Sequence, residues 1–137
     1  MTQEDKHLLL KDLCARLPHG VQAQVDGHVN PLQILGISKL SKSTWAWKKG
    51  TYVVSFWNDT KAIENIKPYL RPMSSMTPDE RREYDKLIAN CLYDAEAYFF
   101  ENYNRLYDWL LAHHFDYRGL IEKGLALEAP KDMYKIE

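Results

Sequence analysis

Apolar residues recur at helical spacing near the start of this 137-residue chain. The members of this stripe are Leu9, Leu10, Leu13, Cys14 and Leu17. Because residues three and four apart lie on one face of a helix, the pattern predicts an amphipathic helix within residues 1–17. Thr2-Gln3-Glu4-Asp5 is typical of a capped helix start, and Pro18-His19-Gly20 marks the helix end.

A second, longer apolar stripe runs through the predicted helical part at residues 77–124. Thr77-Pro78-Asp79-Glu80 has the form of a capping box with proline at the first helical position. The apolar phase continues as far as Leu110, which would make one rod of roughly 54 Å. Such a rod is too long for a compact chain of this size, so we expect a break at residues 101–104, with Asn104 capping a second helix.

Residues 20–66 show the two-residue alternation of strands. The run 21–25 alternates apolar residues with glutamines, and Asp26-Gly27 is typical of a two-residue hairpin turn. Residues 51–57 form another strand pattern, while Pro31 is expected at an edge or bulge. The predicted fold is α+β, with an N-terminal helix, a small bent antiparallel sheet or SH3-like barrel of four or five strands, and C-terminal helices.

The segments between and after these parts have less pattern. Two prolines within residues 67–76 forbid a helix and disfavour a central strand, which predicts an extended connector. Asp116 is expected to cap a last short helix that ends at Gly124. Residues 125–137 are predicted to be an irregular tail, with some apolar side chains docked on the body; the candidates are Met133, Tyr134 and Ile136.

Composition places the chain among folded single-domain proteins. Apolar residues make up 45% and aromatic residues 12% of the chain, which is enough to form a core. No run approaches 18 apolar residues and the N-terminus is polar, so we expect neither a membrane span nor a signal peptide. Cys14 and Cys91 lie far apart without a C-x-x-C motif, which favours two reduced thiols and a cytoplasmic location.

Charge is distributed unevenly although the net charge is only −1. Basic residues outnumber acidic residues seven to three in residues 18–76, and acidic residues outnumber basic ones thirteen to eight in residues 77–137. Oppositely charged layers that face each other would explain this asymmetry, and a charged binding surface is the alternative.

A basic and aromatic run without an acidic residue spans positions 39–52. Its candidate nucleic-acid-binding residues are Lys39, Lys42, Trp45, Trp47, Lys48, Lys49 and Tyr52. Aromatic platforms flanked by lysines are typical of single-stranded nucleic-acid binding, where stacking contributes roughly 1–3 kcal/mol per base. The favoured interpretation is instead that both tryptophans share one strand face and cover the core, while the lysines protect an exposed hairpin.

A group of aromatic residues spreads around more than one face of the predicted C-terminal helices. They are Tyr93, Tyr98, Phe99, Phe100, Tyr103 and Tyr107. One core stripe does not need so many rings, and aromatic residues are enriched at protein interfaces. The set therefore predicts a protein-contact surface for an unknown protein partner or for self-association.

His113, His114 and Asp116 come closest to a catalytic or metal-binding cluster. Adjacent helical histidines point about 100° apart, so one ion does not easily bind both, and the H-E-x-x-H spacing is absent. Helix-end chemistry explains them better, because imidazoles interact well with a helix C-terminus. Cys91 lies on the apolar stripe, where an inert buried thiol is commoner than a reactive one. We therefore expect no metal, no cofactor and no enzymatic activity, and a metal- or cysteine-dependent enzyme ranks third.

Two segments carry a resemblance to other proteins. Residues 67–77 (KPYLRPMSSMT) and 113–130 (HHFDYRGLIEKGLALEAP) resemble segments of an uncharacterised family of small gut-bacterial proteins, which are often encoded near prophage or other mobile-element genes. The resemblance implies a bacterial, intracellular and phage-associated setting and assigns no catalytic residue. The leading hypothesis is a non-enzymatic accessory protein that acts by protein–protein contact, and the alternative is a small nucleic-acid-binding module that uses residues 39–52.

Overall fold

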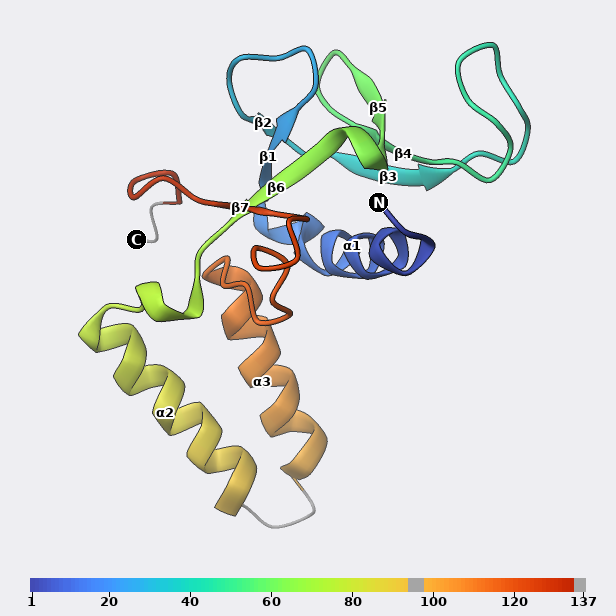
Figure 1. The fold of residues 1–137 in the computed structure, drawn as a ribbon. Coiled ribbons are helices and arrows are strands. Elements are labelled where there is room, and N and C mark those ends of the chain that lie inside the picture. Colours follow the sequence, from blue (N-terminus) through green and yellow to red (C-terminus); the bar gives the residue numbers. More distant parts are fainter. Residues whose placement is uncertain (94–97, 135–137) are drawn as a thin grey trace.

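The computed structural model describes residues 1–93 and 98–134 and has the predicted α+β fold. The strands gather at one end of the molecule with α1 packed next to them, while α2 and α3 extend away side by side (Figure 1). The helices and strands are α1 (Gln3–Arg16), β1 (Gln22–Val25), β2 (Leu32–Gln33), β3 (Gly36–Lys39), β4 (Tyr52–Ser55), β5 (Thr60–Ala62), β6 (Ile66–Leu70), α2 (Pro78–Tyr93), α3 (Phe99–Ala112) and β7 (Leu127–Glu128). Short 3-10 turns lie at η1 (Leu17–His19), η2 (Ile63–Asn65) and η3 (Met73–Ser75).

Helix α1 begins and ends where the sequence predicts. The Thr2 hydroxyl accepts a hydrogen bond from the Asp5 N–H (3.0 Å), and the Asp5 carboxylate accepts one from the Thr2 N–H (3.1 Å). This reciprocal pair satisfies two of the free donors at the helix start. Leu9 and Leu13 are fully buried in the main core, so α1 supplies one wall of that core.

The strands of the described residues form two small sheets in place of one bent sheet or barrel. The first has the order β2-β1-β6-β7, in which β7 pairs with β6 in parallel and the other pairs are antiparallel. The second has the order β3-β4-β5 and is antiparallel. A cluster of fully buried aliphatic residues from both sheets and α1 forms the main core; it includes Val21, Ala23, Ile34, Val54, Ile66 and Leu70.

The two-residue hairpin predicted at Asp26-Gly27 is wrong. A turn does form there, with Gly27 at a φ of +87° and the His28 N–H donating to the Val25 carbonyl (3.0 Å). However, β2 pairs only with the first half of β1, at Gln22 and Ala23. The connection between β1 and β2 therefore spans residues 26–31.

Strand β6 is a central strand, so the extended connector predicted for residues 67–76 is wrong for residues 67–70. Pro68 is buried and pairs with Ala23 of β1 on one side. On the other side β7 pairs with β6 only at Tyr69 and Leu70. Pro68 thus lies where the strand has one neighbour, and its missing N–H can face the side without a partner strand.

The start of α2 agrees with the prediction and the start of α3 does not. The Thr77 hydroxyl accepts from the Glu80 N–H (3.2 Å) and the Glu80 carboxylate accepts from the Thr77 N–H (3.0 Å), as expected for a capping box. The break predicted at residues 101–104 is wrong, because α2 ends at Tyr93 and α3 begins at Phe99. Asn104 lies inside α3 and does not cap it.

The two helices enclose a second, smaller core. Leu106, Leu110 and Phe115 are its buried members, and Tyr84 and Trp109 pack against them. The rings of Tyr84 and Trp109 lie 6.1 Å apart across the two helices, and the Trp109 indole N–H donates to Glu83 (2.8 Å). These contacts hold α2 against α3.

The final short helix predicted from Asp116 to Gly124 is replaced by turns. The Asp116 carboxylate still acts as a cap, since it accepts hydrogen bonds from the N–H groups of Leu120 and Ile121 (both 2.9 Å). The predicted irregular tail contributes the short strand β7. Tyr134 docks on the first sheet as expected, and Ile136 lies outside the described residues.

Candidate functional site

A row of contacting aromatic rings runs along α3 and ends at Tyr117, beyond the helix. Phe99 contacts Phe100 (centroids 5.3 Å apart) and Tyr103 (4.7 Å). Tyr103 lies 6.4 Å from Tyr107, and Tyr107 lies 5.3 Å from Tyr117. We call this surface the aromatic face, and its residues are Tyr98, Phe99, Phe100, Tyr103, Tyr107 and Tyr117.

Much of the aromatic face is in water. The exposed fractions are 78% for Phe100, 56% for Tyr98, 50% for Phe99 and 43% for Tyr107. Leu92, in the last turn of α2, is 65% exposed. Scattered exposed apolar residues are ordinary on a protein surface, but a contiguous group of this kind is typical of an interaction site.

The helical spacing explains why these rings remain uncovered. Asn102, Leu106 and Leu110, spaced four residues apart, are buried. The aromatic stripe has the same spacing but is rotated by one residue around the helix; it comprises Phe99, Tyr103 and Tyr107. Helix α3 is therefore apolar across a wider arc than α2 and the body cover.

The aromatic face includes five of the six residues predicted for protein contact. Tyr103 is half-buried, and the other four are exposed. The side chain of Tyr93 lies outside the described residues. Tyr117, which follows the helix end, belongs to this face but is not among the predicted contact residues. It reaches Tyr107 because the chain reverses at His114, a residue with a φ of +62°. An isolated tyrosine after the helix gives no periodic signal for this contact.

The basic run 39–52 forms a loop between β3 and β4 rather than a strand around the tryptophans (Figure 1). The Thr44 hydroxyl accepts hydrogen bonds from the N–H groups of Ala46 (3.2 Å) and Trp47 (3.0 Å), which holds a tight turn. As a result Trp45 is 99% exposed, so the prediction that it covers the core is wrong. Trp47 is half-buried.

The basic residues lie at the base of this loop and along it. The Lys39 ammonium lies 5.6 Å from the centre of the Tyr52 ring, a cation–π distance. Lys42, Lys48 and Lys49 are exposed. The structure thus keeps the predicted lysines on the surface and adds a fully exposed indole between them.

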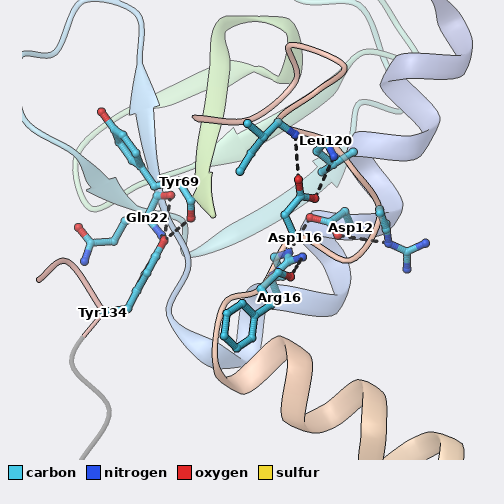
Figure 2. A network of polar contacts seen from close by, with 10 residues as sticks. Asp12, Arg16, Gln22, Tyr69, Asp116, Leu120 and Tyr134 are labelled. Carbon is cyan, nitrogen blue, oxygen red and sulfur yellow. Dashed lines mark hydrogen bonds and ion pairs between the residues drawn. The ribbon is translucent and has the colours of Figure 1, made fainter. Parts of the chain in front are cut away.

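A buried polar network joins α1 to the segment after α3 (Figure 2). Arg16 is fully buried; its Nε donates to the Asp12 carboxylate (2.6 Å), and its Nη2 donates to the Phe115 carbonyl (2.7 Å). Arg118 Nε lies 3.2 Å from the other Asp12 oxygen. Because each charge meets an opposite charge or a carbonyl, this network is a structural junction between distant parts of the chain.

The tail is fastened beside this junction by Tyr134. Its hydroxyl accepts from the Gln22 N–H and donates to the Tyr69 carbonyl, both at 2.8 Å (Figure 2). Burial raises the pKa of Tyr134 to about 12. His114 stacks on the Tyr134 ring, and burial together with the nearby Arg16 charge lowers the pKa of His114 to about 4.

His113, His114 and Asp116 do not converge on one point. His113 Nδ1 donates to the Trp109 carbonyl at the end of α3 (2.8 Å), which is the predicted helix-end chemistry. His114 stacks on Tyr134, and Asp116 caps the following turn. Within residues 1–93 and 98–134, no group of three or more His, Cys, Asp or Glu side chains is arranged to hold a metal ion.

The two cysteines differ in environment. Both are free thiols; Cys91 is half-buried against the second core, whereas Cys14 is exposed on α1. Cys14, although the sequence places it in the apolar stripe of α1, is therefore not part of the buried face of that helix.

A polar cleft of about 350 Å³ lies near the start of α2. The Arg71 guanidinium crosses it and donates to both Glu80 carboxylate oxygens (2.6 and 2.8 Å). These hydrogen bonds, together with the one from the Thr77 N–H, lower the pKa of Glu80 to about 2. The paired charges of Arg71 and Glu80 therefore hold the segment after β6 against the start of α2.

Comparison with known proteins assigns no function to the chain, so a function can be proposed only from the surfaces described above. No protein-family model, curated protein or solved structure matches the chain. In the part of the chain that the structure describes, no helix has the length and apolar character needed to cross a membrane.

Proposed function

We propose that this chain is a non-enzymatic binding protein that acts through protein–protein contact at its aromatic face. The observation that carries the proposal is the contiguous row of rings on α3, in which Phe100 is 78% exposed. Keeping such side chains in water is unfavourable, because fully burying one Phe-sized side chain contributes about 1.5–3 kcal/mol. A partner that covers the face recovers this free energy.

The chemistry of the face suits a protein partner. Tyr103 and Tyr107 combine an apolar ring with a hydroxyl that can form hydrogen bonds at the rim of an interface. Exposed residues of α2 and α3 next to the apolar surface carry both charge signs, including Arg105 and Asp108. Both a different protein and a second copy of the chain fit this description, and the experiment below separates them.

The biological setting belongs to the same proposal. The resemblance of residues 67–77 and 113–130 to small phage-associated gut-bacterial proteins supports an accessory role in a bacterial cytoplasm. The free thiols of Cys14 and Cys91 agree with a reducing compartment.

The test compares two double variants in sedimentation velocity and in affinity capture from a bacterial lysate. Phe100→Glu with Tyr107→Glu changes the aromatic face, while Trp57→Glu with Leu35→Glu adds equal charge at exposed apolar positions elsewhere (90% and 54% exposed). If the wild type self-associates, the first variant loses this self-association and the control keeps it, then the partner is a second copy of the chain. If the wild type stays monomeric, a captured protein that only the first variant loses identifies a different partner.

Nuclease treatment separates direct protein contact from bridging by nucleic acid. A protein captured equally by all three forms, or lost on nuclease treatment, contradicts the proposal. A wild type that is monomeric at high concentration and captures nothing specific contradicts it as well.

A further inference from the structure

A basic cleft lies between the first turns of α1 and the base of the loop that joins β3 to β4. It has a volume of about 300 Å³, and its lining includes Lys6, Lys48, Lys49, Tyr52 and Glu64. Lys6 Nζ lies 3.5 Å from the Glu64 carboxylate, so the one acidic group is already paired. Within the described residues, Lys48 and Lys49 form no ion pair with an acidic side chain. The cleft therefore carries an unbalanced positive charge.

The loop above this cleft presents Trp45 on an ordered turn. The Thr44 N–H donates to the Trp47 carbonyl (2.7 Å), and the Lys49 N–H donates to the Ser43 hydroxyl (2.9 Å). Hydrogen bonds between residues 40 and 50–51 close the base of the loop. The backbone is thus held by its own contacts while the Trp45 indole is 99% exposed. A large flat ring held out in water on a fixed turn is available for stacking.

The spacing of ring and charges matches one class of ligand. Trp45 and Lys49 are four positions apart in the chain, so their Cα atoms lie at most roughly 14 Å apart and a short extended ligand can contact both. Lys39 and Lys42 add positive charge along the same loop. A ligand that satisfies these groups carries repeated negative charges and free flat rings. Single-stranded nucleic acid has both, because its phosphates are anionic and its bases are free to stack.

We propose that the Lys48–Lys49 cleft and the Trp45 ring bind single-stranded nucleic acid. Duplex nucleic acid would satisfy the lysines but would not offer base faces to Trp45. An acidic peptide would also satisfy the lysines but lacks regularly spaced rings. The site lies on the strand end of the molecule, and the aromatic face lies on α3 (Figure 1). Its occupation is therefore a function in addition to protein contact.

Fluorescence anisotropy of a labelled oligothymidylate tests the site across a salt series. The affinity should fall with salt, with a log–log slope of about −0.7 for each phosphate neutralised and about −3 if four lysines take part. Lys48→Glu with Lys49→Glu should weaken binding at least tenfold. Lys86→Glu with Lys123→Glu, the same charge change at exposed positions outside the cleft, should change it less than twofold.

The contribution of stacking is tested by a matched pair of tryptophan variants. Trp45→Ala should weaken binding at least fivefold, whereas Trp57→Ala, at a 90% exposed ring beyond the other end of β4, should leave it unchanged. Circular dichroism confirms that each variant is folded. The double variant Phe100→Glu with Tyr107→Glu should bind the oligonucleotide normally, which separates this site from the aromatic face.

Several results would overturn the proposal. One is the absence of oligothymidylate binding at about 50 mM salt, a concentration at which phosphate contacts are strong. Another is equal weakening by the two charge reversals. Displacement by polyphosphate with no effect of Trp45→Ala would indicate an unspecific anion site. Stronger binding of a glutamate-rich peptide than of the oligonucleotide would indicate a protein ligand.

Discussion

The rings of His114 and Tyr134 lie face to face, with their centroids 3.6 Å apart and their planes inclined by 10°. His114 begins the chain reversal after α3, and Tyr134 belongs to the tail that crosses back to the first sheet. The stack therefore joins the end of the helical pair to the strand end of the molecule. Both side chains are largely buried, and burial of the titratable His114 ring makes the stability of this junction depend on pH.

Acid should destabilise the protein through His114. Its folded pKa of about 4 lies below the ordinary value of 6.5, so the fold favours the neutral ring. Burial disfavours an imidazolium at this position, and the nearby positive charges of Arg16 and Arg71 disfavour it further. The stabilising effect is complete above pH 6.5 and is lost as the pH falls towards 4, a total of about 3 kcal/mol.

The variant His114→Asn tests this pH dependence by denaturant unfolding between pH 7 and 4. Asparagine tolerates the positive φ of this position and does not titrate. We expect the free energy of unfolding to fall less steeply with acid in this variant than in the wild type. His7→Asn, at an exposed position of α1, should keep the wild-type slope. Equal slopes in all three proteins would show that His114 is not the titrating group.

The pairing of Arg71 with Glu80 should stabilise the protein in a lower pH range. Because hydrogen bonds from Arg71 lower the pKa of Glu80 from 4.5 to about 2, the stabilisation is complete above pH 4.5 and is lost as the pH falls towards 2. We expect Glu80→Gln to cost about 2 kcal/mol at pH 7, with partial solvent screening taken into account. Glu122→Gln, at an exposed position, is the control. A stability of Glu80→Gln equal to that of the control would contradict the prediction.

Loss of Arg16 should cost far more than loss of an exposed arginine. Arg16→Met leaves the buried Asp12 carboxylate without its closest partner, which typically costs about 3–5 kcal/mol. Arg81→Met breaks the exposed Arg81–Asp85 pair and should cost less than about 1 kcal/mol. Thermal and denaturant unfolding measure both changes.

The double variant Asp12→Leu with Arg16→Met distinguishes the cost of an unpaired buried charge from the cost of lost packing. It should be more stable than Arg16→Met alone, because no unpaired carboxylate stays buried. If the double variant is the less stable of the two, then lost packing rather than the unpaired charge dominates the cost.

The tail should be released locally when the Tyr134 hydroxyl is removed. Tyr134→Phe leaves the Gln22 N–H and the Tyr69 carbonyl without this partner, at a cost of about 1–3 kcal/mol. Amide hydrogen exchange should accelerate at Gln22. Tyr98→Phe changes an exposed residue and should leave the exchange at Gln22 as in the wild type. Unchanged exchange in Tyr134→Phe would mean that the tail is held by other contacts.

Features set by neighbouring residues could be predicted from the sequence. Both capping boxes depend on atoms three residues apart, so Thr2 and Thr77 marked the starts of α1 and α2 correctly. The surplus of rings on α3 was also visible, because helical periodicity shows when a stripe is wider than one core face needs. The α+β class followed from the order of these patterns.

Features set by distant residues could not be predicted. Pro68 disfavours a central strand in isolation, yet it lies in one because β7 joins β6 beyond the proline. The helical spacing of apolar residues continues from α2 into α3, so this periodicity does not indicate where one helix ends and the next begins. Trp45 and Trp47 alternate as strand residues do, but hydrogen bonds to the Thr44 hydroxyl turn the chain and expose Trp45.

The bond from Arg16 to the Phe115 carbonyl has a consequence for the order of folding. Its two ends are 99 positions apart, and Arg16 is translated long before its acceptor leaves the ribosome. Until then a charged side chain that the finished protein buries completely must stay hydrated, which keeps α1 from docking early. Closing so long a loop is slow, and native contacts of large sequence separation slow folding as a whole. We therefore expect the helical pair α2 and α3 to fold first on the nascent chain and the packing of α1 to be the last step.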